Sequence, residues 1–164
     1  MSLTIRDKII RELVTLLEGF SWTAIPAPTV DKGRLIADPD AAPPPRIFVL
    51  PGIERNDAGP YAKHDLTLPV EVFATAVIGA QNPDELCQAV LGELILCVIG
   101  KEAADAGGRP IKSGGMSDAH ADSVRYLDGG AAAYPATLGT QILTIAATFE
   151  IAYQTNYGDP YTND

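Results

Sequence analysis

The sequence predicts a single α+β domain in which two helices pack on one face of a mainly antiparallel sheet of four to five strands. Three observations support this prediction. An amphipathic helical pattern opens the chain, a second helical stretch begins near residue 82, and the stretches around them alternate apolar and polar residues. This order shows no repeated strand–helix–strand unit, which is typical of an α+β layer fold. The length of 164 residues suits one domain spanning 1–164.

The first helix is predicted over residues 4–19. Charged residues fill one side of this stretch, and the other side carries apolar residues at steps of three and four: Ile5, Ile9, Leu13, Leu16 and Leu17. Thr4 and Asp7 have the spacing of a capping pair, and Gly19 is expected to end the helix in a left-handed conformation. We therefore expect one face of this helix to pack on a sheet.

The next part of the chain alternates predicted loops and strands. Residues 26–45 are rich in proline, alanine and aspartate, and we expect a long exposed segment, either a disordered insertion or an arm that reaches a neighbouring molecule. A short buried strand is predicted over 46–50, followed by a polar loop over 52–65. Residues 66–78 alternate like a strand, but Pro69 lacks a ladder donor and predicts an edge position or a bulge there.

The second helix is predicted to begin at Asn82, with Pro83 at its first position and two acids following. It runs to about Ile99, and Gly100 is the expected end. Its second half is apolar nearly all round, so the helix needs cover on more than one side. A second subunit is one source of that cover.

The last third predicts one loop, two strands and a tail. Residues 101–121 are glycine-rich and read as a loop, and residues 123–130 predict a short strand closed by a turn at Asp128-Gly129-Gly130. Apolar and polar residues alternate without interruption over residues 138–154, which predicts a central strand that contributes strongly to stability. Residues 156–164 are expected to form a short tail that carries Tyr157 and Tyr161, either frayed or laid on a neighbouring surface.

The charge balance disfavours several classes of partner. The chain has 12 Lys and Arg against 21 Asp and Glu, a net charge of −9, so tight binding of nucleic acid and of anionic membranes is not expected. No apolar run approaches the roughly 20 residues that span a bilayer, and the first residues lack the apolar block of a signal peptide. Cys87 and Cys97 would stand about 15 Å apart on one helix, too far for a disulfide.

The common catalytic and nucleotide-binding motifs are absent from the sequence. One constellation suggests a divalent metal site: Asp118, His120 and Asp122 would point to the same side of an extended chain, with His64 as a further ligand or base. The small residues around them favour a solvated acidic loop instead. We therefore predict a protein that is not an enzyme and has no cofactor or metal, with a small metal-dependent enzyme as the alternative from another class.

Several stretches in order along the chain carry a resemblance to a known family. These are the opening helix, the strand pair around RIFVLPG and LTLPVEVFATA, the helix NPDELCQAVLGELILCVIG, the strand RYLDGG and the closing FEIAYQTNYGDPY. Together they resemble the tail terminator proteins of long-tailed phages and prophages, also called tail completion or minor tail proteins. The strongest local match is the closing strand with Tyr-x-Thr-x-x-Gly-Asp-Pro at Tyr153 to Pro160.

The resemblance implies an α+β fold and a structural role in the virion tail, with assembly in the bacterial cytoplasm. Proteins of that family form hexameric rings that cap the tail tube, fix its length and present the surface on which the head docks. The implied partners are other copies of the chain, the tail tube protein and head–tail connector proteins. A neck or head-completion protein of similar size is the closest alternative. The candidate contact residues are Leu91, Ile95, Arg125, Tyr157, Asp159 and Tyr161.

Overall fold

A computed structural model gives the fold, and it describes residues 3–32, 44–57, 63–104, 110–117, 119–133, 142–156 and 158–162. Its main element is a six-stranded sheet with the order β1-β2-β4-β8-β7, and a short strand, β3, pairs beside β2 on β4. The strands are β1 (Thr29–Lys32), β2 (Arg46–Pro51), β3 (Arg55–Asp57), β4 (Lys63–Val77), β7 (Ser123–Ala133) and β8 (Ile142–Asn156).

The predicted α+β class is confirmed, but the predicted sheet of four to five strands is too small. The sheet is also mixed, because β1 pairs with β2 in parallel while the other pairs are antiparallel. The sequence missed β1 and β3 because each is very short and lies in a stretch that reads as a polar or proline-rich loop. Strands of three or four residues carry too little alternation to be recognised.

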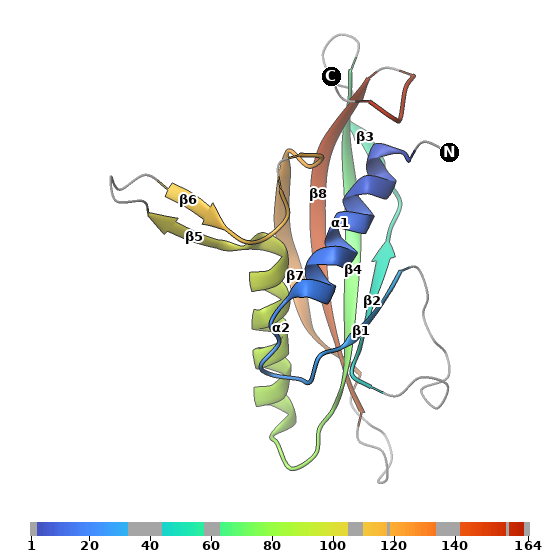
Figure 1. Ribbon diagram of the computed structural model, residues 1–164. Helices are drawn as coiled ribbons and strands as arrows, with labels where there is room; N and C mark the ends of the chain where they lie inside the picture. Colours follow the sequence, from blue (N-terminus) through green and yellow to red (C-terminus); the bar gives the residue numbers. More distant parts are fainter. Residues whose placement is uncertain are drawn as a thin grey trace.

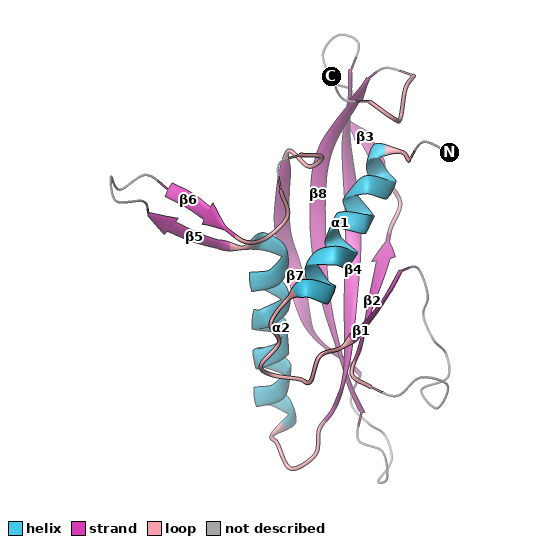
Figure 2. Ribbon diagram, in the orientation of Figure 1, coloured by secondary structure: helices cyan, strands magenta, loops and turns pink. Residues whose placement is uncertain are grey.

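Both helices lie on the same face of the sheet, as predicted (Figures 1 and 2). The first, α1 (Ile5–Gly19), packs over β1 and β2, and the second, α2 (Pro83–Ile99), packs over β7 and β8. A two-stranded hairpin of β5 (Lys101–Ala104) and β6 (Pro110–Ser113) follows α2 and projects away from the sheet (Figure 1). In the described parts of the chain, no helix is long and apolar enough to cross a bilayer.

The helix ends follow the sequence signals at three of four positions. The Thr4 hydroxyl accepts a hydrogen bond from the Asp7 amide at 3.1 Å, and the Asn82 side chain accepts one from the Asp84 amide at 2.9 Å. Gly100 ends α2 with a φ of 82°. Gly19 differs from the prediction, because it is still helical and α1 ends on an extended Phe20.

The core lies between the two helices and the inner face of the sheet. On β8 every second residue is buried. The six apolar ones are each at most 2 % exposed, and Thr155 is 4 % exposed: Leu143, Ile145, Ala147, Phe149, Ile151, Tyr153 and Thr155. β8 pairs with β4 on one side and β7 on the other, so its predicted central position is confirmed.

Pro69 lies inside the sheet, so the predicted edge position is wrong. The alternative, a bulge, agrees with the register, because the three residues 52–54 stand opposite the two residues 68–69 of β4. β4 pairs with β8 along its whole length without a bulge, and on its other side β2 pairs only as far as Val70 while β3 begins at Thr67. Backbone N and O atoms of one strand residue point to the same side. The missing donor of Pro69 therefore faces the interval between two partner strands, where its carbonyl accepts from the Gly52 amide at 2.8 Å.

The predicted turn at Asp128-Gly129-Gly130 is a continuous part of β7. Gly129 is required there for packing, because a Cβ atom on it would stand 2.7 Å from Leu91 Cδ1 and 2.7 Å from the Ala146 carbonyl oxygen. The ladder between β7 and β8 shifts register after Tyr126, which leaves Leu127 as the extra residue of a bulge. Glycine pairs that read as a turn in sequence can thus mark close packing in a strand.

The predicted loops contain more regular structure than expected. The 26–45 stretch contains β1, the 52–65 stretch contains β3 and the start of β4, and the 101–121 stretch contains the β5–β6 hairpin. Residues 33–43 of the proline-rich stretch lie outside the described residues, so the two interpretations of that segment stay predictions. The predicted tail is folded at 158–162, where the Asn156 amide donates to the Thr162 carbonyl at 2.9 Å.

Candidate functional site

The first candidate surface is the face of the sheet opposite the helices, here called the open face. Alternate residues of β4 and β8 point to it, and no described helix covers it (Figure 2). Val77 at the end of β4 is 55 % exposed, and Phe73 and Ala146 lie opposite each other on neighbouring strands. The open face therefore joins apolar side chains to polar ones without cover from the described elements of its own chain.

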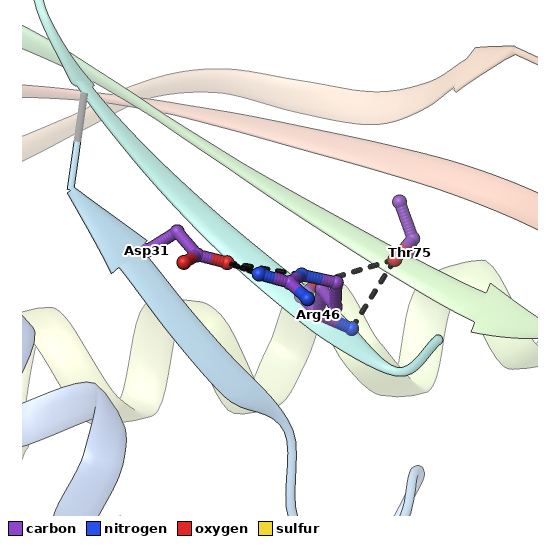
Figure 3. Close-up of polar contacts among 3 residues, drawn as sticks. All are labelled: Asp31, Arg46 and Thr75. Carbon is purple, nitrogen blue, oxygen red and sulfur yellow. Dashed lines mark hydrogen bonds and ion pairs between the residues drawn. The ribbon is translucent and has the colours of Figure 1, made fainter. Parts of the chain in front are cut away.

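Arg46 on β2 contacts residues of both neighbouring strands on the open face, near the edge strand β1 (Figure 3). Its guanidinium forms an ion pair with Asp31 on β1, and its backbone amide donates to the Thr75 hydroxyl on β4 at 3.2 Å. The guanidinium carbon also lies 5.8 Å from the centre of the Phe48 ring. These contacts connect β1, β2 and β4 on one surface, so Arg46 has a structural role.

Polar pairs cross the open face at the other strands as well. Arg125 on β7 forms an ion pair with Glu150 on β8, and the Arg125 side chain is 70 % exposed. The Gln154 amide donates to the Asp65 carboxylate at 2.8 Å, between β8 and β4. Cross-strand pairs of this kind stabilise the sheet.

The second candidate surface is the side of α2 that faces away from the sheet, here called the outer face of α2. Its exposed residues recur at helical spacing: Glu85, Gln88, Ala89, Gly92 and Leu96. Leu96 is 44 % exposed, although most apolar residues of this helix are buried. The β5–β6 hairpin follows directly after α2 and projects away from the sheet (Figure 1).

Two clefts border these surfaces. One of about 420 Å³ lies between the ends of α1 and α2 at the root of the hairpin, and its lining includes Leu16, Phe20, Leu96 and Lys101. The other, of about 370 Å³, lies at the far end of the sheet beside Ile25, Val77 and Ile78. Both linings are largely apolar, which suits contact with another protein surface better than binding of a charged small molecule.

The residues of the metal hypothesis are only partly described. Asp118 lies outside the described residues. His120 is half-buried, and its Nδ1 atom has no hydrogen-bond partner among the described residues. Asp122 is exposed beside β7, whereas His64 lies on β4 and pairs with Asn56 at 2.9 Å. Across the described part of the chain, no three or more His, Cys, Asp or Glu side chains are grouped as metal ligands.

The six predicted contact residues lie in different parts of the fold. Leu91 is 8 % exposed and packs against Gly129, and Ile95 is half-buried against the core, so both help to hold α2 on its own sheet. Arg125 lies on the open face. Asp159 and Tyr161 lie in the folded tail beside the start of α1, and Tyr157 falls outside the described residues. The described residues of this set therefore do not lie together on one surface.

Sequence reasoning missed the outer face of α2, because the apolar residues of this helix mask its pattern. The small residues Ala89 and Gly92 and the larger Leu96 lie at helical spacing on this face. That spacing can be recognised only once it is known which side of α2 packs on the sheet. It also missed Glu93, whose carboxylate accepts hydrogen bonds from the amides of Thr23 at 2.9 Å and Ala24 at 3.1 Å. A lone acid inside a helix carries no sequence sign of such a role.

Burial changes the titration of three side chains. Burial raises the pKa of the Cys97 thiol to about 12, and burial followed by the nearby Asp84 charge raises the pKa of Cys87. The pKa of Tyr153 is also raised, first by burial and then by its hydrogen bond to Glu54. None of these shifts favours a reactive nucleophile, because each holds the group in its protonated form.

Comparison with protein-family models and with curated proteins finds no match to this chain. The arrangement of surfaces on the α+β fold is therefore the basis for a functional assignment.

Proposed function

We propose that this protein is a structural component of a phage or prophage virion. In this proposal it is a tail terminator that caps the tail tube as a hexameric ring, fixes the length of the tail and forms the surface on which the head docks. Its partners are other copies of itself, the tail tube protein and head–tail connector proteins. It acts in the virion tail after assembly in the bacterial cytoplasm.

The observation that carries the proposal is the open face of the sheet, which none of the described elements covers. A closed ring uses heterologous contacts, in which one patch of each subunit meets a different patch of the next. The open face offers one such patch, and the helical layer on the opposite side of the molecule offers different ones. Two unlike surfaces on opposite sides of a thin two-layer fold suit a ring.

The charge of the chain is compatible with the role. A ring on the tail encloses a channel through which DNA must move. The net charge of −9 removes the attraction that would hold a phosphate backbone in that channel.

Negative-stain electron microscopy and native mass spectrometry of the concentrated protein test the proposal. We expect closed rings of six copies. Val77→Asp should abolish the rings and leave a folded chain, because it places a charge on an exposed position of the open face. The matched control is Ile53→Asp, which charges another exposed apolar residue, 87 % exposed, in the loop between β2 and β3. The absence of a closed oligomer at every concentration would contradict the proposal.

A further inference from the structure

The centre of the outer face of α2 carries a glycine that the fold itself does not require. Gly92 lies inside a 17-residue helix, where glycine is unfavourable relative to alanine. Apart from its chain neighbours and the backbone of its own helix, no atom of the described residues lies within 4 Å of a Cβ atom built on it, and its φ is not in the left-handed region. The fold would therefore accept an alanine at this position, and the glycine leaves the helix backbone open to close approach by another surface.

The neighbours of Gly92 on this face fit another helix. Ala89 is a small exposed residue one turn before the glycine, and Leu96 is a large exposed residue one turn after it. If a copy of α2 crosses at Gly92 in the opposite direction, Leu96 of each helix enters the space above Ala89 of the other. Large residues that fill the gaps over small ones are the usual mode of helix packing.

The charges at the two ends of α2 favour the antiparallel direction. Asp84 and Glu85 lie in the first turn, and Lys101 is exposed directly after the last turn. An antiparallel pair places the acids of each copy beside the partner subunit's Lys101. It also sets the positive end of each helix dipole beside the negative end of the other. A parallel pair would instead bring the acids together.

The β5–β6 hairpin gives a second, independent reason to expect a partner here. Its two strands form their own sheet, and among the described elements its extensive contacts are between those strands alone. A two-stranded hairpin is marginally stable without further packing. Because the hairpin leaves the end of α2 directly (Figure 1), the start of an antiparallel partner helix would lie beside the root of the hairpin and add packing there.

We propose that two copies of this chain pair through the outer faces of α2, antiparallel and crossing at Gly92, with the root of each hairpin beside the start of the partner helix. The same patch meets itself, so the contact closes after two copies. It goes beyond the ring of the proposed function and does not depend on it.

A cysteine at the crossing tests the pairing directly. Gly92→Cys places two thiols at the two-fold axis, within the roughly 7 Å between Cα atoms that a disulfide spans. Mild air oxidation should convert most of the protein into a disulfide-linked dimer on a non-reducing gel. The native thiols do not interfere, because Cys87 and Cys97 are each 3 % exposed. The matched control is Gly19→Cys, another glycine with open space around it, which should stay monomeric on the gel. Equal cross-linking of both variants, or none of Gly92→Cys, would overturn the pairing.

A charge exchange tests the direction of the helices. Glu85→Lys should weaken the dimer at least tenfold in sedimentation experiments at low salt, because it sets two cations together. Adding Lys101→Glu to the same chain should restore most of the affinity. A double variant that dimerises no better than Glu85→Lys would overturn the antiparallel arrangement.

The outcomes separate this contact from the ring. Rings without cross-linking of Gly92→Cys would overturn the pairing and leave the proposed function intact. Cross-linked dimers without rings at any concentration would support the pairing and contradict the ring.

Discussion

Glu93 is the residue that attaches the loop after α1 to the second helix. Its carboxylate accepts hydrogen bonds from the backbone amides of Thr23 and Ala24 and from the Thr23 hydroxyl. These amides belong to a bend between α1 and β1, outside the regular elements, so they depend on a side chain for a partner. Glu93 thus fixes the conformation of the segment that connects α1 to the edge strand β1.

We expect Glu93→Ala to lower the free energy of unfolding by about 1–3 kcal/mol, because it leaves backbone donors without their acceptor. Urea unfolding followed by circular dichroism measures this change. Glu18→Ala removes an exposed glutamate from α1 and serves as the control, with a change within about 0.5 kcal/mol. Equal stabilities of the two variants would show that the Glu93 contacts contribute little.

Cys97 gives the stability of the protein a dependence on alkaline pH. Burial raises the pKa of its thiol from 9.0 to about 12, so above pH 9 the unfolded chain releases a proton that the folded chain retains. The stabilisation is complete below the unfolded pKa and falls as the pH rises toward the folded value. Wild type should lose about 1 kcal/mol more than Cys97→Ala between pH 8 and pH 10, measured by urea unfolding. Equal losses of unfolding free energy in wild type and Cys97→Ala would show that the pKa of Cys97 is not raised by folding.

At the scale of elements, the sequence predicted the long amphipathic pieces and missed the short ones. α1, α2 and β8 are recognisable because many residues repeat one period, and each pattern records which side is buried. β1 and β3 owe their existence to pairing with neighbours that lie elsewhere in the chain, at Arg46 and at Thr67. The sequence could not show which apolar residues stay exposed, since a pattern shows which residues are apolar but not which of them the fold itself covers.

The glycines of β7 test the packing between the sheet and α2. Gly129→Ala should destabilise the protein by about 1–3 kcal/mol, because its Cβ would clash with Leu91 and with the backbone of β8. Gly130→Ala should change stability little, since a Cβ there meets nothing within 4 Å. Thermal unfolding of the two variants makes the comparison. Similar melting temperatures would show that β7 lies farther from α2 than described.

β8 provides a second test at this scale. Phe149→Asp should prevent soluble expression, because the side chain is fully buried on the central strand and the new charge would have no partner. Ala152→Asp changes a residue of the same strand that is not fully buried, and it should remain soluble. Ordinary solubility of Phe149→Asp would contradict the assignment of β8 as the central strand.

At the scale of the whole molecule, the tail and the first helix are joined. The Ile5 amide donates to the Pro160 carbonyl at 2.9 Å, and Asp159 accepts from the Tyr161 amide and the Thr162 hydroxyl, each at 2.9 Å. The tail therefore supplies an acceptor to the first turn of α1, where helix amides have no partner of their own.

Asp159→Ala should loosen this connection without unfolding the domain. We expect the Ile5 amide to exchange with solvent at least several-fold faster in hydrogen-exchange experiments, because the turn that presents the Pro160 carbonyl loses two hydrogen bonds. Amides of β8 such as that of Ala147 should keep their wild-type rates. An unchanged rate at Ile5 would show that the turn holds its shape without Asp159.

The meeting of Ile5 and Pro160 also has a practical consequence for anyone who labels this protein. Both positions lie at the same end of the molecule, far from the loop that joins β4 to α2 (Figure 1). A fluorescent reporter fused near either position would occupy that end of the molecule and leave the end with the β4–α2 loop accessible. Two reporters, one at each position, would stand close enough for efficient energy transfer within a single subunit. The transfer would decrease when the folded tail at 158–162 separates from α1.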